Sequence, residues 1–531
     1  MMNIMDDTLQ KYREKANVFK REYGKLIICC FFLGVIVYFP LLTRLLTNAD
    51  GITISITYKS SHDWENSLGR FGIQYMDQLR GNFIFPELTT CFCLFLLSWI
   101  VILTVKIFDI HRKSARLAAG MLLILSPSVS NTLTYYYCSD SYMAAYLLAV
   151  LAAFLMLTRT GVLSWVTAVA AVTLSLTLYQ AYVGVTITLC LFWTIKHCLT
   201  GTITSKRLFV SIARALIGGA LGVLLYLFLF KIYQIITGTV AADNRGFNHM
   251  GVLPWKEVPL LLKQACLASL QYFFSDELFN NSWLHRNLFN LIMVGLGFWA
   301  VVLLLRQNRM VLTKWKYLLV LPGILTIPLA LGCIVILAPE ANIYEATGLL
   351  MLPQMNYAYV FVISLYASLS MEKMWSRIIF VLEKIVVIMI LAISVVFAGV
   401  FQSLLRINAD KTYYVASEIL HHITEEDYDS DRPLMISGQM EKGNFPDLYQ
   451  KLNWAMDGTI ASYGLIWTSP SASQGCWNGV FRQCFGVEYT MCSEEEYNEI
   501  LETEEFQMMS NFPEENSVKV INGVMVVKLS P

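Results

Sequence analysis

Several signatures of familiar enzyme classes are missing from this chain. It has no phosphate-binding glycine loop, no Gly-x-Ser-x-Gly elbow, no His-Glu-x-x-His and no nucleotide-sugar fold within its apolar part. Its 12 cysteines are scattered, many of them in apolar segments, and none has zinc-type spacing supported by histidines. These absences disfavour an enzyme that uses a cytosolic nucleotide-sugar donor, whereas a donor already attached to a lipid needs no such fold.

Charged residues are also scarce. Of the 531 residues, 15% are charged, 56% are hydrophobic and 13% are aromatic. No single soluble domain of this size usually has such a balance, so the composition indicates a polytopic membrane protein. The formal net charge is zero and says nothing about partners, but the distribution of charge along the chain is informative.

About eleven apolar segments are long enough to cross a bilayer, whose core of about 30 Å requires about twenty apolar residues per helix. Lys and Arg lie in the connections that follow every second segment, so the positive-inside rule predicts a cytoplasmic N-terminus and an outer C-terminus. The charge-free run Gly161–Ile195 is too long for one crossing and must turn near Tyr179–Tyr182, at the outer surface. The predicted spans are 26–47, 86–107, 116–135, 141–158, 162–179, 181–197, 208–235, 286–305, 317–338, 351–371 and 378–402.

The composition divides the chain into three parts. Residues 1–25 are expected to form a cytoplasmic amphipathic segment, and the lack of a small-residue cleavage site after the first apolar run predicts a retained helix. Residues 26–403 are expected to be an all-α transmembrane domain with long outer loops at 48–85 and 238–284. Residues 404–531 become polar and acidic, which predicts a small α/β domain outside the membrane.

This last part has its own predicted elements and cysteines. Strands are expected at Pro433–Ser437 and Val518–Leu529, and helices at Leu448–Tyr463 and Glu494–Met508. Its three cysteines allow one disulfide and a free thiol, but their number alone does not decide between that and three thiols. They are Cys476, Cys484 and Cys492.

The first outer loop is the most informative segment, because a connection between two helices needs only about six residues. It contains Asp63-Trp64-Glu65-Asn66 and then Gly69-Arg70. A carboxylate at a membrane surface can take a proton from an incoming hydroxyl, and an arginine can hold a departing phosphate. We therefore predict Asp63 as general base, Glu65 as its neighbour or substitute, and Arg70 as a phosphate-binding or loop-anchoring group.

A structural explanation of the same residues is equally open. Asp63 would then cap a short helix that begins near Trp64, and Arg70 would pair with Glu65. Later in this loop, Asp77 and Arg80 are expected to pair within a helix.

Further candidates lie in other outer segments. Asp140 follows three tyrosines at the mouth of the fourth span, where it could position an acceptor or cap the helix that Ser139-Asp140 predicts. Tyr179, Gln180 and Tyr182 could bond a sugar or phosphate, or form part of an aromatic belt. Arg245 could bind a lipid phosphate or be a solvated loop charge, and Arg44 could snorkel to the surface.

Taken in order along the chain, these motifs resemble the bacterial O-antigen glucosyltransferase type II family. The resemblance rests on Asp63-Trp64-Glu65-Asn66 with Gly69-Arg70, Leu178-Tyr179-Gln180-Ala181-Tyr182, Asn244-Arg245-Gly246-Phe247-Asn248 and Asn408-Ala409-Asp410. The chain departs from expectation at His62-Asp63, where two consecutive acids would be more usual. Glucose follows from the family name, and another hexose is equally compatible with the residues.

The resemblance implies a membrane glycosyltransferase of the GT-C class. It would move a hexose from a polyprenyl-phosphate sugar to a surface polysaccharide outside the cytoplasmic membrane and would invert the anomeric centre, with Asp63 as base. The expected partners are these two substrates and membrane lipid, with no nucleic acid. Many members of the class use a divalent metal, but the sequence shows no clear ligand cluster, so metal dependence is left open.

Other functions also place charged residues in outer loops of a polytopic protein. A flippase or transporter of lipid-linked saccharides is disfavoured because intramembrane charges are few and no inverted repeat is evident. A polysaccharide polymerase or ligase would favour one very large outer loop late in the chain. A purely structural or adhesive protein does not explain a long first loop that combines acids, Trp and Arg.

Overall fold

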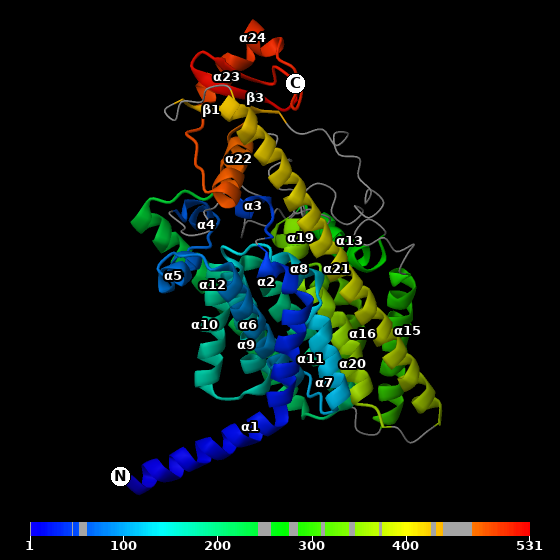
Figure 1. Ribbon diagram of the computed structural model, residues 1–531. Helices are drawn as coiled ribbons and strands as arrows, with labels where there is room; N and C mark the ends of the chain where they lie inside the picture. Colours follow the sequence, from blue (N-terminus) through cyan, green and yellow to red (C-terminus); the bar gives the residue numbers. More distant parts are fainter. Residues whose placement is uncertain are drawn as a thin grey trace.

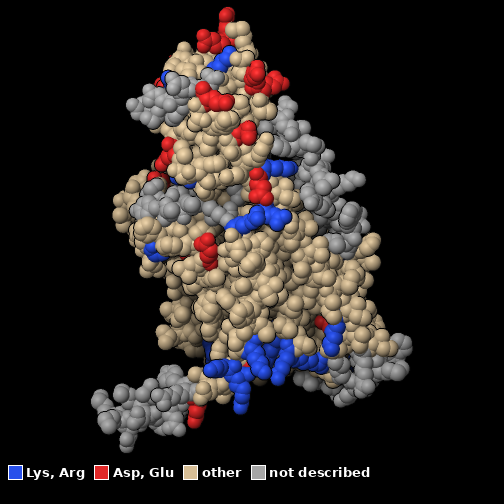
Figure 2. All heavy atoms as spheres, viewed as in Figure 1, with Lys and Arg blue, Asp and Glu red and all other residues tan. Residues whose placement is uncertain are grey.

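The chain folds into a helical bundle with a small α/β unit at one end. The computed structural model describes residues 2–44, 46–52, 61–242, 256–275, 285–309, 314–338, 346–370, 374–425, 432–438 and 470–530. The N-terminus lies at the end of the bundle opposite the α/β unit, which contains the C-terminal strands (Figure 1). Lys and Arg gather at that opposite end of the bundle, while Asp and Glu are more frequent over the α/β unit (Figure 2).

Six helices in the described residues are long and apolar enough to cross a membrane, and the shorter α10 is also apolar. These six candidates support a helical membrane protein without establishing the predicted number of eleven spans. They are α6 (Pro86–Ile107), α9 (Ser139–Thr158), η1 with α11 (Gln180–Thr200), α12 (Ser205–Thr237), α15 (Arg286–Gln307) and the Ile378–Glu425 part of α21 (Met374–Glu425).

Several predicted spans are divided into shorter helices. The segment 116–135 contains a break before Pro127, and proline disfavours the helical conformation of the residue that precedes it. The segment 317–338 is interrupted before Pro328 and again near Gly332. The remaining helices of the bundle are α1 (Met2–Val37), α2 (Phe39–Thr43), α3 (Ala49–Ile52), α4 (Asp63–Ser67), α5 (Gly72–Leu79), α7 (Lys113–Ile124), α8 (Pro127–Thr132), α10 (Val162–Leu178), η1 (Gln180–Tyr182), α11 (Val183–Thr200), α13 (Val258–Phe274), α16 (Lys314–Leu325), α17 (Ile327–Leu331), α18 (Ile334–Leu337), α19 (Ala346–Leu350), η3 (Pro353–Asn356) and α20 (Tyr357–Ala367).

The charge-free run folds as the sequence predicts. Helix α10 ends at Leu178, η1 covers Gln180–Tyr182, and α11 begins at Val183. The turn is therefore at the predicted tetrapeptide, and it lies at the same end of the bundle as α4 and α5, because Gln180 bonds the loop between them.

The α/β unit contains a three-stranded sheet in the order β1-β3-β2. Strand β1 (Leu434–Ser437) is parallel to β3 (Val524–Lys528), and β2 (Val518–Ile521) is antiparallel to it. The predicted strand Val518–Leu529 is thus a hairpin, turning at Asn522 and Gly523, which both have positive φ angles as a tight hairpin turn requires. Helices α22 (Pro470–Phe485), α23 (Glu494–Leu501) and α24 (Glu504–Gln507) complete the unit.

The predicted boundary at residue 404 falls inside α21, which continues to Glu425. Its last turns contribute Val415, Ala416 and Ile419 to the core of the α/β unit. The single helix therefore connects the bundle to the unit. The predicted helix Leu448–Tyr463 lies outside the described residues.

The α/β unit also packs directly on the first loop. Ile52 of α3 is fully buried in a core cluster with Trp477 and Phe481 of α22. The hydroxyl of Tyr136 donates to the carbonyl of Gly51 (2.7 Å) and receives a bond from the Gln483 amide (3.2 Å). The start of the first loop is consequently held between the bundle and the α/β unit.

Gly479 makes this contact possible, and we expect Gly479→Ala to weaken it. A Cβ atom at this position would lie 2.0 Å from the carbonyl oxygen of Ile52, so α22 would have to move away from α3. Such overpacking costs about 1–3 kcal/mol, measurable as a lower melting temperature of the detergent-solubilised protein. A Cβ atom at Gly475, on the same helix, would meet no neighbouring atom within 4 Å, so Gly475→Ala is the matched control and should not lower stability. Equal melting temperatures for the two variants would contradict a tight contact.

Candidate functional site

Asp63 opens α4 and is exposed to solvent. Its Oδ2 atom accepts a hydrogen bond from the Ser61 hydroxyl (2.8 Å). The N-cap residue of α4 is His62, and Asp63 is the first residue of the helix. Asp63 is therefore not the capping residue, as the structural explanation would require. An exposed carboxylate that accepts a hydrogen bond from one serine hydroxyl is still accessible to a substrate hydroxyl.

Glu65 lies two residues after Asp63 on α4 and is buried. It belongs to an electrostatic group around Tyr137: burial raises the pKa of this phenol well above its usual value, and nearby groups that include Asp50 and Glu65 raise it further. Asp50, on α3, is therefore a third acid of this region. The sequence analysis did not single it out, because nothing in the short Asn48-Ala-Asp-Gly segment distinguishes it from a turn.

Arg70 follows α4 and contacts aromatic side chains of the bundle. Its Nη1 atom donates to the Tyr142 hydroxyl (3.1 Å), and its Nε atom donates to the Gln180 Oε1 atom (3.4 Å). The guanidinium carbon lies 4.7 Å from the centroid of the Tyr179 ring, a cation–π distance. The partners in these contacts are all uncharged, so they do not neutralise the positive charge of the guanidinium.

The residues of the predicted turn at 179–182 hold the segment that carries Arg70. Gln180 is buried, and its amide nitrogen donates to the carbonyl of Leu68 (2.7 Å) and to the Tyr226 hydroxyl (2.8 Å). Tyr179 and Tyr182 are also buried, with ring centroids 4.9 Å apart, rather than spread over an outer belt. The turn therefore fixes the loop that carries Arg70.

A second cluster joins the end of α5 to the start of α9. Arg80 forms ion pairs with Asp77, as predicted, and with Asp140, and it also donates to the carbonyl of Tyr137 (2.9 Å). The Asp77 side chain is fully buried and contacts His62 Nε2 at 2.9 Å. Helix α9 begins at Ser139, so Asp140 lies in its first turn and accepts a bond from the Ser141 amide (2.8 Å).

The structure thus brings most of the predicted residues to one end of the bundle, near α4 and α5 (Figure 1). Arg70 contacts both Tyr179 and Gln180. Asp140 lies on α9 two residues before Tyr142, which also binds Arg70. Arg245, with Glu340 and Glu345 from the outer loop before the tenth predicted span, lies outside the described residues. Arg44 is exposed and pairs with Asp410 at 3.6 Å.

The sequence analysis missed Tyr142 and Tyr226, which bind Arg70 and Gln180. Both are single aromatic residues inside apolar helices, so only their contacts identify them. Within the described part of the chain, no three His, Cys, Asp or Glu side chains are grouped so that they could hold a metal ion.

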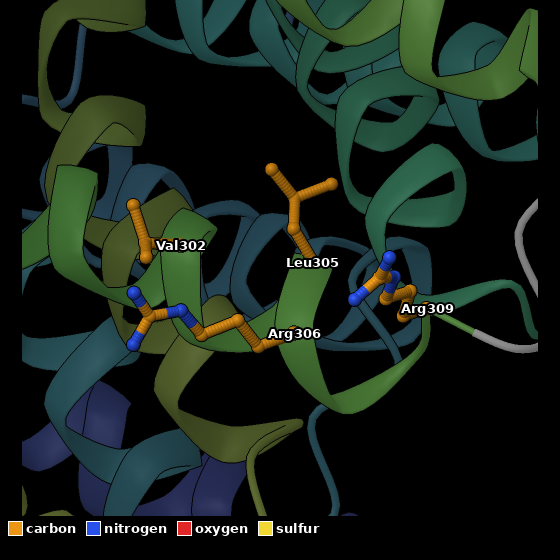
Figure 3. A pocket seen from close by; sticks show the side chains of 4 residues that line it. All are labelled: Val302, Leu305, Arg306 and Arg309. Atoms are coloured by element: carbon orange, nitrogen blue, oxygen red, sulfur yellow. The ribbon is translucent and has the colours of Figure 1, made fainter.

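A hollow on the molecular surface lies away from this site, at the end of α15. The hollow is lined by Val302, Leu305, Arg306 and Arg309 (Figure 3). None of the predicted site residues takes part in it. The candidate site is therefore defined by its side-chain contacts and not by this hollow.

The fold and the acidic and arginine-containing cluster at one end of the bundle define a helical membrane protein with a polar site next to its apolar spans. A comparison with protein families places the chain further: the family described as "Glucosyl transferase GtrII" matches residues 39–363, more than half of the chain. The chain belongs to this family and is a glycosyltransferase. The match includes α4, α5 and the turn at Tyr179, and it ends before α21 and the α/β unit. No curated protein matches the chain.

Proposed function

We propose that the protein transfers glucose from a polyprenyl-phosphate donor to a hydroxyl of a cell-surface polysaccharide, on the outer side of the cytoplasmic membrane. The observation that carries this proposal is that one segment of the first loop holds both an exposed carboxylate, Asp63 at the start of α4, and a cation with uncharged partners, Arg70 after the end of α4. The family supplies glucosyl transfer, and the loop supplies a base and an anion-binding group.

In the proposed reaction Asp63 accepts the proton of the acceptor hydroxyl, and the oxygen of that hydroxyl attacks the anomeric carbon of the donor. The bond between that carbon and the phosphate oxygen breaks, and polyprenyl phosphate leaves. Attack opposite the leaving group inverts the anomeric centre. Arg70 stabilises the negative charge that the phosphate gains, which a good leaving group needs more than protonation.

Exposure favours Asp63 over Glu65 as the base. A base must reach the hydroxyl of a large acceptor, and the Asp63 side chain is exposed whereas Glu65 is buried. Glu65 then acts next to Tyr137 as part of the floor of the site. We assign Tyr179 and Gln180 to the positioning of Arg70, Tyr182 to the support of Tyr179, and Asp140 to the placement of Arg80. Arg245 is retained as a proposed contact for the lipid phosphate.

The test is a transfer assay in purified membranes, with a polyprenyl phosphate that carries radiolabelled glucose and with isolated surface polysaccharide. Label should move to the polysaccharide. Absence of transfer, with labelled lipid instead moving across the membrane of sealed vesicles, would favour a flippase. Growth of the polysaccharide by whole repeating units would favour a polymerase or ligase.

The proposed topology places the N-terminus in the cytoplasm and the α/β unit outside. It is supported by the gathering of Lys and Arg at the end of the bundle opposite that unit (Figure 2). The transfer site next to α4 and α5 would then face the outer surface.

We expect Cys484 to react with a membrane-impermeant maleimide in intact spheroplasts. Cys476, Cys484 and Cys492 are all free thiols, which leaves the possible disulfide unformed, and only Cys484 among them is exposed. The Cys484→Ser variant provides the background, because Cys476 and Cys492 are buried. Labelling of Cys484 that required prior permeabilisation of the membrane would reverse the proposed topology.

A further inference from the structure

Helix α5 presents an apolar face to its surroundings and a polar residue to the protein. Asp77 is fully buried on its inner side, whereas Tyr75 and Leu79 are 56% and 84% exposed. Residues four apart lie on the same face of a helix, so these two side chains form one outward surface. The outward surface of α5 thus includes a large apolar side chain, while Asp77 pairs with His62 and Arg80 on the inner side.

This apolar surface continues along the chain into α6. Phe83 and Phe85 are about half exposed, and their ring centroids are 6.2 Å apart. On α6 the exposed large side chains are Leu88, Phe92 and Phe95, at 67%, 42% and 45%. Spacings of four and three residues place them on one line along the helix. We call Leu79, Phe83, Phe85, Leu88, Phe92 and Phe95 the aromatic track.

The track on α6 is narrower than the exposed apolar faces of α12 and α15. Two thirds of the apolar window of α6 is buried, compared with 22% for α12 and 33% for α15. On one side Leu94 packs against Gly34 of α1, and on the other Cys93 contacts Ser139 of α9 at 3.6 Å. The exposed side chains of α6 thus follow a single line between the contacts to α1 and to α9, which a single hydrocarbon chain can follow.

The track has a defined start and length. It begins at Leu79, the residue before Arg80. Arg80 donates to the carbonyl of Tyr137, and Tyr137 is also an electrostatic neighbour of Arg70. With a rise of about 1.5 Å per residue, α6 from Pro86 to Phe95 covers roughly 14 Å, about half of a hydrocarbon core of about 30 Å. The track therefore leads from the polar site to about the middle of the bilayer.

We propose that the aromatic track binds the isoprenoid tail of the lipid-linked donor while the phosphate lies at the site. This inference rests on the proposed function, since it assigns a place to the tail of the proposed donor. A branched, unsaturated chain packs well on phenylalanine rings. Because the track begins next to the polar site, a tail bound on it would place the phosphate end of the donor at Arg70. The contact makes the enzyme selective for a long isoprenoid over a short one.

The first experiment compares long-chain and short-chain glucosyl phosphates as donors. The double variant Phe92→Ala/Phe95→Ala should raise the KM for the long-chain donor about tenfold and leave kcat unchanged, because the tail loses two aromatic contacts. The KM for a short-chain donor that does not reach these residues should stay the same. The control is Phe209→Ala/Phe228→Ala on α12, two exposed phenylalanines on another apolar helix, which should change neither KM. An unchanged KM in both double variants would show lipid contact only and would overturn the proposal.

A second measurement does not depend on transfer. A polyprenyl phosphate with a photoreactive group in its tail, incorporated with the full-length protein in phospholipid nanodiscs, should label the peptide that contains Leu88–Phe95. Excess unlabelled polyprenyl phosphate should compete, whereas excess phospholipid should not. Competed labelling without any sugar transfer would retain the track and reject the proposed reaction. Transfer without competed labelling of this peptide would retain the reaction and reject the track.

Discussion

Asp63→Asn is expected to yield a folded protein that has lost its transferase activity. Asparagine has the shape of aspartate but cannot accept the proton of the acceptor hydroxyl, and loss of a general base lowers the rate by about a hundredfold to ten-thousandfold. The structural cost should be small, because Asp63 is exposed and its side chain accepts a bond from Ser61 only through one oxygen that asparagine retains. The measurement is kcat for glucose transfer in membranes with matched protein levels.

Two further variants separate the base from the loop that carries it. Ser61→Ala removes the hydroxyl partner while the carboxylate remains, so transfer should fall only slightly. Glu87→Gln neutralises another exposed acid, in the first turn of α6, and should leave transfer unchanged. If Asp63→Asn retained full activity while Glu65→Gln lost it, the buried neighbour would be the base.

Local features of the chain predicted a substantial part of this arrangement. The charge-free run was too long for one crossing, which required the turn at Tyr179–Tyr182, and the turn is there. The spacing of Asp77 and Arg80 predicted their ion pair, since residues three apart share a helix face. Asn522-Gly523 is a strong hairpin signal, and it divides the predicted strand Val518–Leu529 into β2 and β3.

Contacts between distant segments could not be predicted in the same way. Arg70 binds Tyr142, 72 residues away, and Gln180 binds Tyr226 on another helix. Each partner lies in an apolar stretch whose composition indicates only a membrane span. Hydrophobic periodicity identifies the helices but does not show which helix faces pack against each other. The site is formed by side-chain contacts between such faces. The first-loop motif provided the candidate residues Asp63 and Arg70, while the residues that support them required the fold.

Arg80→Met is expected to destabilise the protein strongly. The Arg80 side chain lies between Asp77, which is fully buried, and Asp140, which is nearly so. Methionine would fill part of the space, but two carboxylates would remain close together in a buried place without their common cation. Removing one partner of a buried ion pair costs about 3–5 kcal/mol. Thermal unfolding in detergent should show a large decrease in melting temperature. Transfer should also fall, because Asp140 lies two residues before Tyr142, the tyrosine that Arg70 binds.

The exposed pair of Arg44 and Asp410 offers the matched comparison. These side chains are 53% and 66% exposed at a separation of 3.6 Å, so Arg44→Met should change stability by no more than about 1 kcal/mol. Neutralising the acids as well, in Arg80→Met/Asp77→Asn/Asp140→Asn, should recover much of the lost stability, since no unpaired charge is then buried. Because that triple variant keeps Asp63 and Arg70, its activity separates two roles of the cluster. Restored stability with restored transfer would make the three residues a structural clamp for α5, whereas restored stability without transfer would show that their charges also act on the substrate.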